Sequence, residues 1–66
     1  TIEPRYNQQA LKTLEQLASL SPTDAKVVYN LGVIYDQLGD STKAQAAFRK
    51  AVGLKPDYEA ARALIK

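Results

Sequence analysis

The sequence predicts an all-α fold in which about four short helices pair as antiparallel helical hairpins. Apolar residues recur at intervals of three and four along most of the chain, which is the spacing of one face of a helix. No segment shows the strict alternation expected of a strand, and turns containing proline or glycine separate the helical segments. Because 66 residues form at most one small domain, helices joined by such short turns must be antiparallel neighbours.

Two helices are predicted before residue 39. The second is predicted over residues 22–38, because Ser21 can cap it, Pro22 suits the first helical position and Asp24 places a carboxylate in the first turn. The first helix has one apolar face that we expect to be buried, opposite a polar face. The residues of this apolar face are Ala10, Leu11, Leu14, Leu17 and Ala18.

Two further helices are predicted after a tight turn at Gly39 and Asp40. Gly39 can adopt the left-handed conformation that closes a helix, and Asp40 can cap the next helix at once. The third helix is predicted over residues 41–52, with Gly53 loosening its end. The fourth is predicted to begin with Pro56 in its first turn and to continue to the chain end.

The composition argues against catalysis. The chain has no cysteine and no histidine, which removes thiolate metal sites, the commonest metal ligand and the commonest general base. Its three glycines are isolated from one another, so it has no phosphate-binding loop. Asp36 and Asp40 are close in sequence, but a helix surface and a helix cap explain them better than a catalytic pair. We therefore expect no enzymatic activity, no cofactor and no metal.

The charge and hydropathy patterns argue against nucleic-acid binding and membrane insertion. Nine basic and seven acidic residues are spread along the chain, so the formal net charge of +2 is dispersed over the surface. No window contains the roughly 18 consecutive apolar residues that a membrane-spanning helix requires. Cytosolic and exported proteins can both lack cysteine, so the sequence indicates no cellular compartment.

An internal repeat is indicated by the prolines. The interval along the chain from Pro22 to Pro56, which we call the repeat offset, also separates Leu20 from Leu54. Seven positions within this unit have the spacing of the tetratricopeptide repeat (TPR) signature; they are Leu31, Gly32, Tyr35, Ala44, Phe48, Ala51 and Pro56. The chain therefore resembles the TPR family, with Val28 in place of the family's tryptophan.

The resemblance implies a fragment of an α-solenoid built from hairpins of TPR type. Within a single domain, it places one complete repeat at residues 25–58 and the start of the next repeat, or a C-terminal capping helix, at residues 59–66. Residues 1–24 are then a partial repeat or a capping helix. Both alternatives stay open, because Leu17 stands one repeat offset before Ala51, where TPRs usually have alanine.

Gly32 interrupts the apolar side of the second predicted helix, where an interior glycine costs roughly 1 kcal/mol relative to alanine. It lies on the side that must meet the third helix, so the missing side chain lets the two helices approach. The alanines at positions 44, 47 and 51 of the third helix leave shallow holes on its facing side. We expect the bulky side chains of Tyr35 and Phe48 to fill the remaining space between the two helices. Packing is favoured over ligand contact as the role of Gly32.

Another side of the second predicted helix carries a set of residues that we call the mixed stripe. It consists of Lys26, Tyr29, Asn30, Val33 and Gln37. From the residues alone, a half-solvated surface and a binding surface are both open. The resemblance to TPRs implies a binding surface, because the first helix of each repeat lines a concave groove that binds segments of partner proteins. An asparagine amide can pair with an extended peptide backbone, and tyrosine offers a large contact area.

Two functions follow as hypotheses. The first is a protein–protein interaction module that binds a partner segment through the mixed stripe, with Tyr29 and Asn30 lying off the core. The alternative is self-association into a homo-oligomeric scaffold through apolar positions of the terminal helices, such as Leu11 or Ile65. Self-association has a physical basis because stacked repeats normally need about three units to close a core.

Overall fold

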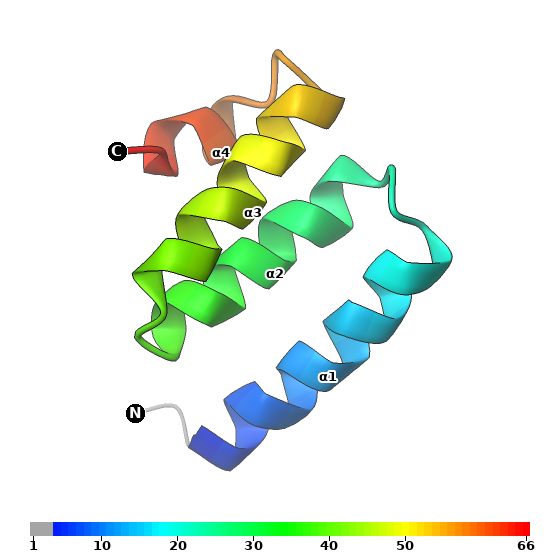
Figure 1. Ribbon diagram of the computed structural model, residues 1–66, viewed down its shortest axis with the longest axis vertical. Coiled ribbons are helices and arrows are strands. Elements are labelled where there is room, and N and C mark those ends of the chain that lie inside the picture. The colour runs from blue at the N-terminus through cyan, green and yellow to red at the C-terminus, as the bar shows by residue number, and fades with distance from the viewer. Residues whose placement is uncertain (1–3) are drawn as a thin grey trace.

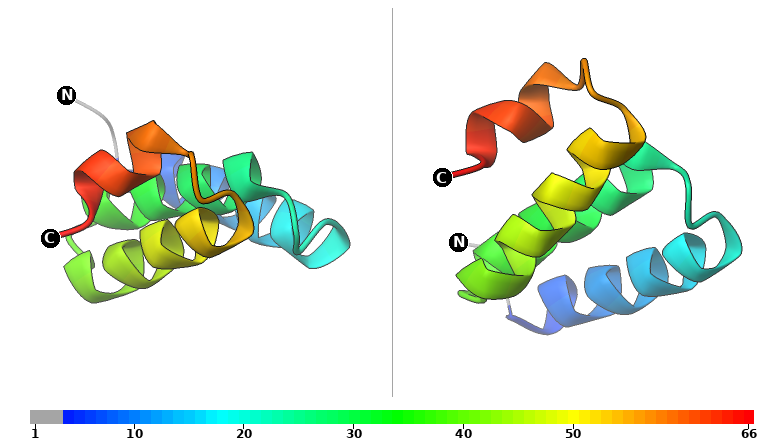
Figure 2. Two further views of the ribbon diagram at one scale, coloured as in Figure 1. Left: turned by 90° about the horizontal axis from the view of Figure 1, so that it is seen from above. Right: turned by 45° about the horizontal axis from the view of Figure 1, so that its top comes forward.

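Four helices follow one another in the computed structural model, which describes the backbone of residues 4–66 and the burial of residues 8–66. They are α1 (Pro4–Leu20), α2 (Ala25–Gln37), α3 (Ser41–Leu54) and α4 (Glu59–Leu64). Each helix packs on the next one along the chain, so α2 lies between α1 and α3 (Figure 1). Helix α4 folds back against α3, on the side away from α1 (Figure 2). The described residues form no strand, and the predicted all-α hairpin architecture is confirmed. The first three residues of the predicted 1–24 unit lie outside the described residues.

Helix α2 begins three residues later than the sequence analysis placed it. Pro22 lies in a turn that is closed by the Asp24 backbone N–H donating to the Ser21 carbonyl at 3.1 Å. Asp24, in an extended conformation, is the N-cap, and its carboxylate accepts from the backbone N–H groups of Lys26 and Val27. The prediction that Ser21 caps this helix was therefore wrong, because the carboxylate nearer to Ala25 reaches the free N–H groups of the first turn.

The start of α4 repeats this arrangement one repeat offset further along the chain. The Tyr58 backbone N–H donates to the Lys55 carbonyl at 3.0 Å, and Pro56 lies in the turn that this bond closes. Pro56 is thus outside the helix, whereas the sequence analysis placed it in the first helical turn. The same turn precedes both helices, which supports the internal repeat in three dimensions.

The turn between α2 and α3 has the predicted conformation. Gly39 has a φ of 87°, and it is the one residue with a positive φ among those described. Its N–H donates to the Asp36 carbonyl, and the Asp40 N–H donates to the Tyr35 carbonyl at 2.9 Å. This pair of bonds is the Schellman motif, which satisfies the last carbonyl groups of a helix. The Asp40 carboxylate then accepts from the Lys43 N–H and caps α3, as predicted.

The last two helices end at positions that the sequence analysis missed. Helix α3 continues through Gly53 to Leu54 and stops where Lys55 becomes extended before a proline, which disfavours the helical conformation in the preceding residue. Helix α4 ends at Leu64 instead of continuing to the chain end. The Gln45 side chain on α3 binds this end: its amide nitrogen donates to the Leu64 carbonyl at 2.8 Å, and its amide oxygen accepts from the Lys66 N–H at 2.9 Å.

The core lies mainly between α2 and α3 and is rich in alanine. Gly32 is buried on α2, and a Cβ atom built on it would lie 2.5 Å from Cε1 and 2.7 Å from Cδ1 of Phe48. The glycine therefore makes room for the phenylalanine ring, and its predicted packing role is confirmed. Phe48 has only 2% of its surface exposed. The other buried apolar residues are Val28, Ala44, Ala47, Ala51 and Ala61. The alanines at positions 44, 47 and 51 are those predicted to leave shallow holes beside the phenylalanine.

Helix α1 is less covered than its apolar face predicts. None of residues 8–20 is buried, and the best covered positions, Leu11, Leu14 and Ala18 among them, are only half-buried. Leu17 and Leu20 are exposed, with 43% and 81% of their surfaces accessible. The expectation that one full face of this helix is buried was wrong, because α2 is its main neighbour and covers one side of that face alone.

Candidate functional site

The mixed stripe lies on α2, and its five residues share one side of that helix. Lys26 and Gln37 are exposed near the two ends, and Tyr29, Asn30 and Val33 are half-buried between them. The stripe thus presents two aliphatic or aromatic side chains, two amides and a cation on about three turns of helix. Such a combination can contact apolar side chains and hydrogen-bond a peptide backbone in one place.

Tyr29 also supports the core, which the sequence analysis did not predict. Its ring centroid lies 5.9 Å from that of Phe48 and 5.2 Å from that of Tyr58, and both ring pairs are tilted. Tyr29 and Tyr58 pack together against the buried cluster around Ala51 and Ala61. The prediction that Tyr29 lies off the core was therefore wrong. Its ring belongs to an aromatic cluster contributed by α2, α3 and the residue that caps α4.

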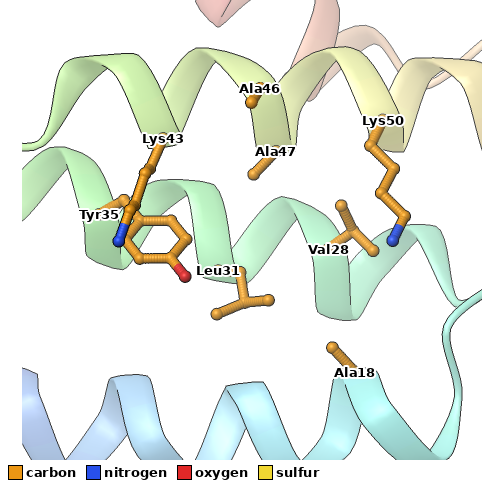
Figure 3. A pocket seen from close by; sticks show the side chains of 8 residues that line it. All are labelled: Ala18, Val28, Leu31, Tyr35, Lys43, Ala46, Ala47 and Lys50. Carbon is orange, nitrogen blue, oxygen red and sulfur yellow. The ribbon is translucent and has the colours of Figure 1, made fainter.

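A hollow between α1, α2 and α3, which we call the three-helix groove, has a volume of about 260 Å³ (Figure 3). Val28 and Leu31 of α2 and Ala47 of α3 form its floor. Lys43 and Lys50 extend from α3 along one edge, and Ala18 of α1 lies on the other. The complete lining is Ala18, Val28, Leu31, Tyr35, Lys43, Ala46, Ala47 and Lys50. The sequence analysis identified no binding surface here.

Tyr35 borders this groove and is only half-buried, whereas the sequence analysis placed its ring within the core. Its hydroxyl donates to the Glu15 carboxylate of α1 at 3.2 Å, and the Lys43 ammonium lies 5.7 Å from its ring centroid. Burial raises the pKa of Tyr35 above its usual value, and the hydrogen bond to Glu15 and the negative charges of Glu15 and Asp40 raise it further. Each of these effects favours the protonated hydroxyl, which joins α1 to α2 through its bond to Glu15.

The two surfaces lie on opposite sides of α2. Successive helical residues are about 100° apart, so Val33 of the mixed stripe lies roughly 160° around the helix from Leu31 in the groove floor. The sequence analysis did not single out the lysines of the groove, because it treated the charges of the chain as dispersed over the surface. Their spacing of seven residues, which aligns Lys43 with Lys50 along one side of a helix, was the available signal.

Two other kinds of site, a metal site and a membrane-spanning helix, are not found in the part of the chain that the structure describes. It contains no group of three or more acidic, cysteine or histidine side chains that could hold a metal ion. None of its helices is both long and apolar enough to cross a membrane.

Comparison with known proteins identifies the family. The tetratricopeptide repeat family matches residues 25–58, which are the turn-to-turn unit from the start of α2 to the cap of α4. No curated protein and no solved structure gives a significant match. Tetratricopeptide repeats are non-enzymatic units that mediate protein–protein interaction. The matched region covers half of the chain and coincides with the α2–α3 hairpin and its signature residues, so this protein belongs to the tetratricopeptide repeat family.

Proposed function

We propose that the chain binds an extended segment of a partner protein through the mixed stripe of α2. The main support for this proposal is the exposure and hydrogen bonding of the Asn30 side-chain amide. Asn30 is half-buried at the centre of the stripe, and its side chain makes no hydrogen bond to any residue that the structure describes. An amide in this position can donate to and accept from a peptide backbone laid along the helix.

The aromatic cluster supports the same proposal. Because Tyr29 is held between the rings of Phe48 and Tyr58, its ring is already fixed before a partner arrives. A fixed aromatic side chain loses little conformational entropy on binding and is a favourable contact for that reason. Tyr58 is also half-buried, so it extends the apolar part of the surface from α2 to the start of α4.

Replacing Asn30 with alanine is expected to weaken partner binding without destabilising the fold. Loss of a backbone-directed amide costs about 1–3 kcal/mol when its partner group is left buried and unpaired. We would select peptides from a random library on the immobilised chain and measure their affinities for the parent and Asn30→Ala by fluorescence anisotropy. Thermal melts followed by circular dichroism should coincide for the two proteins, because Asn30 makes no described hydrogen bond.

Two further variants make this test specific. Gln16→Ala removes an exposed amide from α1, away from the stripe, and should leave every affinity unchanged. Tyr29→Phe keeps the ring that packs against Phe48, so it tests the hydroxyl of the stripe without opening the core. Selected peptides that bind the parent and Asn30→Ala equally well would contradict the proposal.

Self-association is a second candidate function, and the exposed leucines of α1 favour it. Leu17 and Leu20 lie three positions apart on a helix, so they share one side, and both are exposed. Such neighbouring apolar side chains are typical of surfaces that another protein covers. Leu11 and Ile65, which the sequence analysis chose for this role, are half-buried and less suited to it.

We expect the isolated chain to sediment as a dimer or larger species at micromolar concentration, if α1 self-associates. Changing Leu17 and Leu20 together to glutamine should then give a folded monomer, because neither side chain is in the core. Its melting temperature should no longer depend on protein concentration, since no association stabilises the folded chain. The control changes the exposed Ala60 and Ala63 of α4 to glutamine, and it should not alter the oligomeric state. A parent chain that is monomeric throughout this concentration range would exclude the second candidate.

A further inference from the structure

The three-helix groove is apolar at its floor and positively charged along one edge. Val28 and Ala47 are nearly fully buried, while Leu31 is half-buried and reaches the open side (Figure 3). The described residues that line the groove include two lysines and no acidic residue. An apolar hollow with cations on its rim fits a ligand that carries apolar side chains beside negative charge.

The two lysines define a direction and a spacing. Lys43 and Lys50 lie seven residues apart on α3, which corresponds to two helical turns or about 10.5 Å along the helix axis. A second helix lying along α3 presents carboxylates at the same interval when its acidic residues are seven positions apart. Its side chains three and four positions after the first carboxylate share that side, so they reach the groove floor.

A negative charge on α1, outside the groove lining, helps to orient such a ligand. Glu15 of α1 lies beside Tyr35, and its carboxylate accepts the hydrogen bond from the tyrosine hydroxyl. Negative charge is therefore fixed on the α1 side, and positive charge extends from the α3 side. A ligand helix whose acidic and apolar residues share one side is attracted to the groove with its carboxylates toward the lysines of α3.

We propose that the three-helix groove binds an acidic amphipathic helix of a partner protein. The carboxylates of that helix pair with Lys43 and Lys50, and its aliphatic side chains contact Leu31, Val28 and Ala47. This site is independent of the mixed stripe, because the two lie on opposite sides of α2. One chain can consequently hold two different partner segments, an extended one and a helical one.

The test uses two synthetic helical peptides and fluorescence anisotropy. The acidic peptide has glutamates at the seven-residue interval, with leucines three and four positions after the first. The basic peptide has the same sequence with lysine in place of those glutamates. The parent chain should bind the acidic peptide roughly ten-fold more tightly than the basic one at low ionic strength, and added salt should reduce this difference.

Two substitutions locate the binding to the groove. Reversing both charges, Lys43→Glu with Lys50→Glu, should invert the preference between the peptides. The matched control, Arg49→Glu with Arg62→Glu, changes net charge equally at exposed positions outside the groove lining and off α1, and should preserve the preference. Ala46→Gln places bulk in the groove from an exposed position and should weaken the acidic peptide about ten-fold without a change in melting temperature.

Several results would overturn the proposal. Failure of the acidic peptide to bind, or equal affinity for both peptides, would exclude an acidic ligand. If Ala46→Gln does not change the affinity for the acidic peptide, the peptide is attracted to the surface lysines but does not enter the groove. A dimer of the chain alone that Ala46→Gln converts to a monomer would show that a second copy occupies the groove. Loss of binding in Asn30→Ala with no effect of the lysine changes would assign the peptide to the mixed stripe.

Discussion

Replacing Gly32 with leucine is expected to unfold the chain or to destabilise it by at least about 1–3 kcal/mol, the usual cost of overpacking a core. A Cβ atom alone would lie 2.5 Å from Cε1 of Phe48, so even the first added carbon overlaps the ring. Phe48 is 2% exposed and also contacts Tyr29, so the ring has no free space into which it can move. Helices α2 and α3 must separate to accept any larger side chain, and that separation opens the core. Thermal melts by circular dichroism measure the effect.

The other helical glycine supplies a control for this prediction. Gly53 lies in α3, and a Cβ atom built there meets nothing within 4 Å. Gly53→Ala should therefore stabilise the chain by about 0.4–1 kcal/mol, because alanine has less freedom to lose on folding. Gly32→Ala should destabilise it in the same assay, although the added atom is identical. Equal melting temperatures for these two alanine variants would contradict the packing role of Gly32.

The α2–α3 hairpin was predictable from the sequence because its signals are local. The turn needs a residue in the left-handed conformation, which Gly39 adopts, and a side chain that caps the next helix, which Asp40 supplies. Two neighbouring residues therefore determine the turn. The starts of α2 and α4 were misplaced because Pro22 and Pro56 suit either a turn or a first helical position. Only the hydrogen bonds that close each turn distinguish the two, and they depend on the conformation of Asp24 and Tyr58.

The candidate sites were less predictable because they depend on more than one helix. Helical spacing correctly placed the five residues of the mixed stripe together on α2. It could not show that Tyr29 meets rings from α3 and from the start of α4, since that contact depends on how the three elements fold together. The three-helix groove likewise depends on the separation between α1 and α3, and no sequence periodicity determines that separation.

The low burial of α1 has a structural explanation in the internal repeat. The repeat offset relates Leu14 of α1 to Phe48 of α3, yet the phenylalanine is buried and the leucine is half-buried. Phe48 is covered because α2 brings Gly32 against it. No residue of α1 whose burial the structure describes is buried to the same extent, and Leu17 and Leu20 are exposed there. These two leucines leave apolar surface on α1 that another protein can cover.

Replacing Phe48 with alanine is expected to leave the chain largely unfolded at room temperature. Truncation of a buried phenylalanine costs about 3–5 kcal/mol, and a single core in a chain of this size rarely supplies more than about 3–5 kcal/mol in total. The cavity would lie beside Gly32, which has no side chain to fill it, and beneath Tyr29, whose ring would lose its neighbour. Circular dichroism should show loss of most helical signal, and a urea titration should show no cooperative transition.

A milder variant keeps this prediction testable when Phe48→Ala does not fold. Phe48→Leu retains part of the side-chain volume and should fold with a lowered melting temperature. Gly32→Ala should then cost less in the Phe48→Leu background than in the parent, because leucine lacks Cε1, the ring atom nearest to the added Cβ. A double-mutant cycle measures this coupling, and contacting residues usually show about 0.5–3 kcal/mol. Additive effects of the two changes would mean that Gly32 and Phe48 are not energetically coupled. That result would contradict the conclusion that their close packing holds α2 against α3.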